Sequence, residues 1–264
     1  MLRRTLSLSA LLSLLLAPVS LLAETAEEKG LAIAREADRR GQGFGDFEAT
    51  MKMVLSSRRG DRSERELRVR TLEGKEGEGD KSLTIFDTPA DVRGTALLTW
   101  SHPTRDDDQW LYLPALKRVK TIASRNQSGS FMGSEFAFED MRAQEVDKYT
   151  YKYLRDEACG ELTCFVYERY PQDQYSGYTR QVVWMDQAEY RVHKIDYFDR
   201  KQSLLKTLTV SGHSLHLERF WQPGKMEMVN HQTGKSTELL WSDYRFNTGL
   251  SEADFTQNSL MRAR

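Results

Sequence analysis

A two-residue alternation of apolar and polar side chains recurs along most of the chain and constrains its fold more than any other feature. In the first run, apolar residues occupy every odd position from Phe47 to Leu55. Side chains alternate across a strand, so runs of this kind predict strands with one apolar face. Further strands are expected at residues 66–70, 82–87, 95–100, 109–113, 118–122, 148–155, 163–170, 179–186, 191–199, 204–210, 215–221, 226–230 and 237–244.

About a dozen short strands separated by turn-like breaks predict a mainly β protein whose antiparallel sheet curls toward a barrel. The Ala-, Glu- and Arg-rich segment Glu24–Arg40 is expected to be a helix, and Ser251–Leu260 a short final helix or turn. The acidic, glycine-rich stretch Glu73–Asp80 is expected to be a hairpin loop. No Pro-, Gly- or Ser-rich linker divides the rest, so residues 24–264 are expected to form one domain.

The N-terminal segment resembles a secretory signal peptide. Arg3 and Arg4 precede the apolar run Leu6–Leu16, and a small-residue site ends at Ala23. The alternative is an uncleaved anchor helix, but this run is short for crossing about 30 Å of hydrocarbon. Residues 1–23 are therefore expected to be removed on export to the periplasm. The remaining chain has 36 basic and 39 acidic residues, a net charge of −3, which argues against nucleic-acid binding.

The only two cysteines, Cys159 and Cys164, stand close together in the sequence CGELTC. In an oxidising compartment such a pair predicts a structural disulfide across a hairpin turn. The alternative, a thiol oxidoreductase, uses a Cys-x-x-Cys motif at the start of a helix. Here the spacing is longer and the flanking segments are strand-like, which favours the structural disulfide.

Patterns typical of metal sites and of catalysis are weak. His213 and His216 are three residues apart in a strand-like segment, which places them on opposite faces. The run Asp106–Asp108 lacks the glycine and the distal glutamate of a calcium loop and is expected to be a solvated turn. Ser134 has no assignable His and Asp partners, and the pair Glu139–Asp140 is expected to face solvent or to cap a helix. We therefore expect no metal, no cofactor and no enzymatic activity.

The segment Trp110–Met141 combines an aromatic strand, a basic run, a polar Ser/Gly loop and a short helix-like stretch. Its apolar tip, Phe131–Gly133, predicts a greasy loop beside an aromatic sheet, which suits reversible binding of an apolar ligand. The basic run Lys117–Lys120 is interpreted either as a solvated strand face or as a contact for anionic lipid head groups or an acidic partner.

One apolar face of such a sheet must be covered, either by a packed core or by a ligand in a cavity. Flexible Met side chains suit a surface that packs around varied guests, but they are equally suited to filling a core. The sequence alone leaves both interpretations open for Met51, Met53, Met132, Met141 and Met185.

Four segments are similar to the LolA-like family of outer-membrane lipoprotein-sorting proteins, in the branch often found beside RND/MMPL-type exporters. They are residues 110–120 (WLYLPALKRVK), 128–141 (SGSFMGSEFAFEDM), 221–239 (WQPGKMEMVNHQTGKSTEL) and 250–256. The resemblance implies an incomplete, strongly curved antiparallel β-barrel. It also implies that helices cover the open mouth and that an apolar ligand occupies the concavity.

The resemblance leads to a functional hypothesis with named residues. We expect a monomeric periplasmic carrier or chaperone for a lipid or an acylated lipoprotein moving to or from the outer membrane. The alternatives are an accessory or sensor protein that binds an RND/MMPL-type transporter, and an enzyme using a polar cluster such as Ser134, Glu135 and Asp140. The expected ligand-binding residues are Met51, Met53, Leu67, Val69, Leu83, Ile85, Leu98, Trp100, Trp110 and Tyr112, and the expected lid residues are Phe131, Met132, Phe136, Phe138 and Met141.

Overall fold

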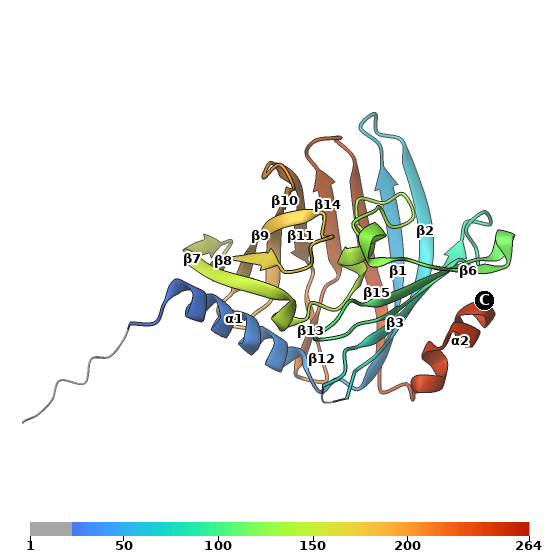
Figure 1. Cartoon of the computed structure of the whole chain (residues 1–264), viewed down its shortest axis with the longest axis horizontal. Helices are drawn as coiled ribbons and strands as arrows, with labels where there is room; N and C mark the ends of the chain where they lie inside the picture. The colour runs from blue at the N-terminus through green and yellow to red at the C-terminus, as the bar shows by residue number, and fades with distance from the viewer. Residues whose placement is uncertain (1–22, 76, 264) are drawn as a thin grey trace, which may run out of the picture.

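The computed structural model describes residues 23–75 and 77–263, and its main feature is one large antiparallel sheet (Figure 1). A first helix, α1 (Ala26–Gly41), precedes the sheet. The strands of the sheet are β1 (Asp46–Ser56), β2 (Arg62–Leu72), β3 (Lys81–Thr88), β4 (Ala96–Trp100), β5 (Asp108–Leu113), β6 (Arg118–Thr121), β7 (Tyr149–Cys159), β8 (Leu162–Pro171), β9 (Tyr178–Asp186), β10 (Val192–Asp199), β11 (Leu204–Ser211), β14 (Lys225–Asn230) and β15 (Ser236–Phe246).

The thirteen strands follow the order β6-β5-β4-β3-β2-β1-β15-β14-β11-β10-β9-β8-β7, so β6 and β7 are the two edges and the barrel is not closed. The sheet curves around the segment that joins β6 to β7, and α1 lies across one open end (Figure 1). That segment contains only the short 3-10 turns η2 (Ser124–Asn126), η3 (Phe138–Met141) and η4 (Val146–Lys148). The predicted incomplete, curved antiparallel barrel is confirmed.

Helix α1 begins at a capping box and packs tightly on the edge strand β7. Glu28 N donates to Thr25 Oγ1 (3.1 Å), while Thr25 N donates to Glu28 Oε2 (2.8 Å). A Cβ atom on Gly30 would lie 2.9 Å from Tyr153 N, so only glycine permits this approach of helix and strand. The helix is thereby fixed over the concave face of the sheet near β7.

The C-terminal segment covers the opposite, convex face near the other edge (Figure 1). Its elements are η5 (Glu252–Phe255) and α2 (Gln257–Arg262), in the region where a short helix was predicted. Phe255 and Leu260 are fully buried there, and Trp100 Nε1 donates to Phe255 O at 2.8 Å. Strands β3 and β4 are therefore buried on both faces, by the concave core on one side and by α2 on the other.

The two-sided burial corrects the expected position of the ligand-binding residues. Strand register pairs Leu67 with Phe86 and Arg68 with Ile85, so Phe86, and not Ile85, shares the concave face with Leu67. The prediction that all ten residues line one concavity is wrong. Strands β3 and β4 have apolar residues on both faces, so alternation in the sequence does not show which residues face the concavity. Met51, Met53, Leu67 and Val69 lie on the concave face, whereas Leu83, Ile85, Leu98, Trp100, Trp110 and Tyr112 pack with α2 on the convex face.

A second correction concerns the strand expected at residues 215–221. The structure forms a small separate hairpin there, β12 (Ser214–His216) and β13 (Phe220–Gln222), with Leu217 and Glu218 at positive φ in the turn. This hairpin lies between β11 and β14 in sequence and contacts α1. The described residues between β2 and β3, 73–75 and 77–80, form no helix or strand, as the predicted loop requires.

The predicted signal peptide, residues 1–23, lies outside the described residues except for Ala23 and stays a prediction. Within residues 23–75 and 77–263, neither helix has both the length and the apolar composition needed to cross a membrane.

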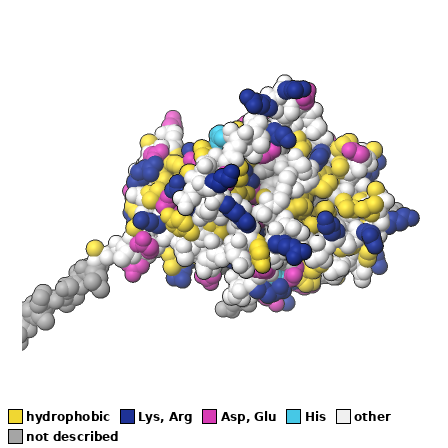
Figure 2. Space-filling model, turned by 45° about the horizontal axis from the view of Figure 1, so that its top comes forward, with side chains coloured by type: hydrophobic (Ala, Val, Ile, Leu, Met, Phe, Trp, Pro, Cys, Tyr) yellow, Lys and Arg dark blue, Asp and Glu magenta, His cyan; other side chains and the backbone are white. Residues whose placement is uncertain are grey.

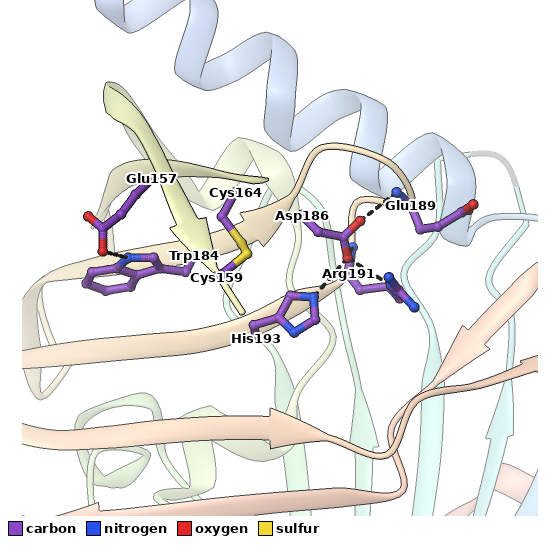
Figure 3. The surroundings of a disulfide bond; sticks show 8 residues. All are labelled: Glu157, Cys159, Cys164, Trp184, Asp186, Glu189, Arg191 and His193. Carbon is purple, nitrogen blue, oxygen red and sulfur yellow. Dashed lines mark hydrogen bonds and ion pairs between the residues drawn. A yellow bond between two sulfur atoms is a disulfide. The ribbon is translucent and has the colours of Figure 1, made fainter. Parts of the chain in front are cut away.

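Cys159 and Cys164 form a disulfide at the end of the β7–β8 hairpin, with their Cα atoms 5.9 Å apart (Figure 3). Neither cysteine lines the cavity described below. The bond therefore ties the ends of two strands that are already paired, and a structural role is the one that its position supports.

Replacing both cysteines with serine is expected to lower the free energy of unfolding by about 2 kcal/mol. The estimate follows from the short loop that the bond closes in the unfolded chain. Urea unfolding with and without a reductant measures it. Reductant should destabilise the natural chain and leave the double variant unchanged. Equal midpoints for the natural chain in both conditions would contradict the prediction.

Candidate functional site

The loop after β6 fills the half of the concavity that lies over β1–β5. Phe131 is fully buried and Phe136 is 2% exposed, and the Phe131 ring lies 5.8 Å from the Phe86 ring and 5.6 Å from the Phe138 ring. Met132 and Met141 are half-buried against the same core. The five expected lid residues therefore form a plug, defined here as residues 131–141, that packs on Met51 and Leu67 and their neighbours.

Polar contacts fix the plug to the sheet on several sides. Arg65 Nη1 donates to Met132 O (2.6 Å), and Glu135 N donates to Thr237 Oγ1 (3.0 Å). Asn230 Nδ2 also donates to Glu135 Oε2 (2.7 Å). If the plug moved away from the sheet, all three hydrogen bonds would break. The expected movement of these residues as a lid stays a prediction.

The other half of the concavity is empty. A cavity of about 1010 Å³ lies between α1, strands β7–β11, the β12–β13 hairpin and the inner end of the plug. Its walls are mainly aromatic and aliphatic side chains, and its rim includes the exposed residues Arg39, Gln144 and Arg219. The apolar walls include Ala34, Ala37, Phe136, Val146, Tyr149, Tyr151, Tyr167, Tyr178, Met185, Tyr190, Val192, Ile195, Tyr197, Leu208, Val210, Phe220, Trp221 and Met226.

The rim is held by hydrogen bonds between three segments that are distant in sequence. Arg219 Nη2 of the hairpin turn donates to Gln42 O at the end of α1 (2.7 Å), and Arg40 Nη1 donates to Ala188 O of the β9–β10 turn (3.0 Å). Trp221 Nε1 donates to Glu189 Oε2 of that turn (3.2 Å). The rim is therefore a ring of polar contacts around an apolar interior.

The β9–β10 turn is itself fixed by a buried carboxylate. Asp186 has no exposed side-chain surface, accepts from Glu189 N (2.6 Å) and from Arg191 Nε (2.8 Å), and lies 2.9 Å from His193 Nε2 (Figure 3). These hydrogen bonds lower the pKa of Asp186 although burial opposes them. The turn thus presents Glu189 and Arg191 at the rim in a fixed position.

A row of polar side chains crosses the concave face at the inner end of the cavity. Strand register aligns one residue from each of six adjacent strands, and all six side chains point to the same face. The row consists of Tyr151, Arg169, Gln181, Tyr197, Lys206 and Asn230.

One cation of this row, Lys206, forms a buried ion pair with the plug. Its Nζ lies 2.8 Å from Asp140 Oδ2, with side-chain exposures of 5% and 8% for Lys206 and Asp140. Tyr178 OH donates to the same carboxylate (2.9 Å), and Lys206 Nζ also donates to Glu135 O (2.8 Å). Burial raises the pKa of Tyr178 well above its ordinary value, so this phenol stays protonated as a donor.

The burial of Asp140 and Glu139 corrects the expectation that this pair faces solvent. The alternative, that the pair caps a helix, holds for Asp140, which accepts from Ala137 N at the start of η3 (2.7 Å). Glu139 is 6% exposed and accepts from Ser176 Oγ (2.7 Å) and Gly177 N (2.8 Å). Burial, with the nearby Asp140 charge, raises the pKa of Glu139. The sequence shows only two adjacent acids, and their partners lie far along the chain, in the loop before β9 and on β9 and β11.

Asp107 corrects a second expectation, because it is buried rather than part of a solvated turn. Its side chain has no exposed surface and pairs with Lys148 and with Arg142, whose Nη1 lies 3.2 Å from Asp107 Oδ2. His102 N also donates to it (2.8 Å). This carboxylate connects the start of β5 to the segment that leads into β7.

Ser134, a candidate nucleophile in the sequence, bonds locally to the backbone of Phe136.

Glu145, near the entry to β7, carries a pH-dependent prediction. Burial and the nearby Asp80 charge raise its pKa to about 7 in the folded protein, so unfolding releases a proton between about pH 4.5 and 7. Stability due to this group is therefore present below about pH 4.5 and is lost as the pH rises to 7. Glu145→Gln is expected to be about 1–2 kcal/mol more stable than the natural chain at pH 8 for this half-buried group.

Urea unfolding at pH 8 and pH 4 checks this prediction. The stabilisation should disappear at pH 4, where the natural carboxyl group is also neutral, and the exposed control Glu161→Gln should change little at either pH. A gain from Glu145→Gln that is equal at both pH values would contradict the assignment.

Within residues 23–75 and 77–263, no group of three or more His, Cys, Asp or Glu is arranged to hold a metal ion. Lys and Arg side chains are scattered over the face in Figure 2 and do not gather in one patch. The basic residues at 117, 118 and 120 are mostly exposed along edge strand β6, as the solvated-face interpretation predicts.

Comparison with known proteins places the chain among proteins of this architecture. A crystal structure described as an outer membrane lipoprotein-sorting protein domain from Vibrio parahaemolyticus is 54% identical and covers 89% of this chain and 100% of its own, with a TM-score of 0.87. A DUF1329 family protein from Desulfovibrio piger is 31% identical over 89% of this chain and 99% of its own, with a TM-score of 0.84. This chain belongs to the DUF1329 family.

Two further comparisons agree with this assignment. A family model described only as "Uncharacterized protein" matches residues 78–262. A LolA superfamily protein from Nitrosomonas europaea is 21% identical over 90% of this chain and 100% of its own, with a TM-score of 0.70, and it shares the fold of this DUF1329 protein. No curated protein matches the chain. The expected resemblance to outer-membrane lipoprotein-sorting proteins is confirmed by the 54% identical relative, and the LolA-like fold by the Nitrosomonas europaea structure.

Sequence reasoning identified the plug of this DUF1329 protein but missed its cavity. Of the fifteen residues expected to form the site, only Phe136 lines the cavity. The available signal was the tyrosine alternation at Tyr149, Tyr151 and Tyr153, continued by Tyr167 on the next strand. The alternation predicts strands in these segments, but it does not by itself show that their aromatic face lines a cavity.

Proposed function

We propose that this DUF1329 protein is a periplasmic carrier that binds a lipid or a lipidated protein in the cavity between α1 and β7–β11. One observation carries the proposal: the sheet leaves about 1010 Å³ of its concavity unfilled, behind walls of aromatic and aliphatic side chains. Volumes of about 300–1,000 Å³ are typical of sites for small organic ligands, and this cavity reaches the upper end. Protein interiors are normally close-packed, with few voids larger than a water molecule, so a cavity of this volume is not an ordinary feature of a hydrophobic core.

The physical basis of binding would be the burial of hydrocarbon against these walls. Transfer of apolar surface from water contributes about 25 cal/mol per Å², or about 0.8 kcal/mol per buried CH₂. One acyl chain would thus be held strongly enough for transport. Contacts of this kind have little directionality, which permits release when the walls move apart.

The family supports the same role. The Vibrio parahaemolyticus relative, at 54% identity, is described as a lipoprotein-sorting domain, and the LolA superfamily shares the fold. The signal-peptide pattern of residues 1–23 supports export to the periplasm. The polar groups that an enzyme would need are engaged elsewhere, since Glu135 binds Asn230 and Asp140 binds Lys206. A non-enzymatic binding protein fits these contacts best.

Native mass spectrometry of protein purified from the periplasm without detergent tests the proposal. We expect an added mass that corresponds to a lipid, and saturable binding of a fluorescent fatty acid to the delipidated protein. Finding neither would contradict the proposal. Contact with an RND/MMPL-type transporter and a monomeric state stay predictions, and chemical crosslinking and light scattering check them.

A further inference from the structure

Arg169 lies at the inner end of the cavity and is the unpaired cation of the polar row. The residue is 8% exposed and lines the cavity together with its cross-strand neighbours Tyr151 and Gln181. Its Nε donates to Gln181 Oε1 at 2.6 Å. Among residues 23–75 and 77–263, no carboxylate forms an ion pair with it, and neither terminal nitrogen donates a hydrogen bond to another residue.

The other buried cation of the row, Lys206, lies three strands from Arg169, after Gln181 and Tyr197. Lys206 has its own carboxylate, Asp140, at 2.8 Å, and a backbone acceptor, Glu135 O. A buried charge without a partner is costly, so proteins pair such groups or bind an ion beside them. Arg169 has only an amide and tyrosine rings around it, and its guanidinium lies 5.0 Å from the Tyr149 ring centre.

The carboxylates of Glu139 and Asp140 also line this cavity, but Glu139 is bound by Ser176 and Gly177, and Asp140 by Lys206. Four tyrosines, Tyr149, Tyr151, Tyr167 and Tyr197, line it together with Arg169. Tyr151 OH donates to Val146 O (2.9 Å), whereas the hydroxyls of the other three make no hydrogen bond within the described chain. Phenol and guanidinium groups together form a set of hydrogen-bond donors for an oxyanion inside an apolar cavity.

On β9, two apolar residues separate the polar row from the β9–β10 turn at the rim. Along β9, Gln181 is four residues from Met185, and Val183 lies between them on the same face. At about 3.3 Å per residue, about 13 Å of strand separates Met185 from Gln181. A ligand that enters past the β9–β10 turn would therefore lay hydrocarbon along this wall and place its charge beside Arg169.

We propose that Arg169 is the anion-binding residue of the cavity and that the natural cargo is an amphiphile with one anionic head group, a carboxylate or a phosphate monoester, bound head first. This inference rests on the proposed carrier function and names the class of cargo. A neutral acylglycerol group would leave the Arg169 guanidinium without a counter-ion, so we expect such a ligand to bind less tightly. The two terminal nitrogens of the guanidinium match a pair of oxygens on either anion.

Binding of three probes with the same chain tests the proposal by calorimetry: dodecanoate, dodecyl phosphate and dodecan-1-ol. The full mature chain is expected to bind the anions about 10- to 100-fold more tightly than the alcohol. Arg169→Met should reduce anion affinity by this factor and leave alcohol affinity within about twofold. The preferred anion identifies the source, a fatty acid or a phosphate-bearing lipid. Arg59→Met, at an exposed residue outside the cavity lining, is the matched control and should keep the preference.

The outcomes separate this inference from the carrier function. If no probe binds, the carrier function itself fails. If the alcohol binds as tightly as the anions, the cavity binds lipid but Arg169 is not its anion site. Equal losses for all three probes in Arg169→Met would assign Arg169 a purely structural role and overturn the inference.

Thermal unfolding gives a readout that a structural role would not produce. Removing an unpaired buried charge should leave the melting temperature of the ligand-free protein unchanged or raise it by a few degrees. Dodecanoate should then raise the melting temperature of the natural chain and not that of Arg169→Met. Should Arg169→Met fail to fold, Arg169→Lys replaces it. This variant keeps the charge but loses the paired donors, so anion affinity should fall several-fold while alcohol affinity stays constant.

Discussion

Replacing Lys206 with Met is expected to lower the free energy of unfolding by about 3–5 kcal/mol, because it leaves the Asp140 carboxylate buried without a cation. Asp140 is 8% exposed at its side chain, and Tyr178 alone cannot neutralise it. Lys206 also donates to Glu135 O, so the same change loosens the plug. Chemical denaturation followed by circular dichroism measures the effect.

Two further variants make this prediction specific. Lys52→Met removes an ion pair whose partners, Lys52 and Glu64, are 43% and 56% exposed at their side chains, and it should cost at most about 1 kcal/mol. Adding Asp140→Asn to Lys206→Met should restore part of the lost stability, since the double variant buries no charge at this point. A cost for Lys206→Met no larger than that for Lys52→Met would show that the buried pair is not what holds the plug.

Replacing Leu208 with Trp is expected to weaken lipid binding at least about tenfold, because the larger side chain projects into the cavity. Leu208 is 4% exposed, lies on the central strand β11 and lines the cavity between Ile195 and Met228. Space is available beside it, so the folded state should lose little stability. Titration with a fluorescent fatty acid, together with thermal unfolding, separates the two effects.

The matched control for that variant is Leu154→Trp. Leu154 is an exposed leucine of β7 outside the cavity lining, so the same chemical change there should leave binding unaltered. If Leu208→Trp bound lipid as well as the natural chain did, the ligand site would have to lie elsewhere, for example beneath an opened plug.

The strands and the plug of this fold could be predicted from the sequence because their signals are local. Alternation from Phe47 to Leu55 marks β1, and the run Phe131–Met141 shows a cluster of aromatic residues within a loop. The faces of β3 and β4 could not be predicted, because Ile85 and Phe86 are adjacent and both apolar. Only the packing of α2, more than 150 residues later in the chain, decides which of them faces outward.

The candidate site was less predictable, since its chemistry depends on which residues lie opposite one another. Asp140 forms its ion pair with Lys206, and Asp107 forms ion pairs with Arg142 and Lys148. No spacing rule in the sequence relates these positions. The empty volume follows from a difference between the two halves of the sheet. The chain fills one half with Phe131 and its neighbours, and no other segment of residues 23–75 and 77–263 fills the other half.

The open barrel also has a consequence for how copies of this protein meet. An incomplete barrel has two edge strands, and free strand edges invite pairing with another chain. At the β6 edge, the exposed residues Arg118 and Lys120 of the strand and Lys117 just before it would meet the same charges of a second copy. On β7 the close approach of α1 at Gly30 shields the backbone. The barrel can therefore stay open without inviting aggregation through its edges.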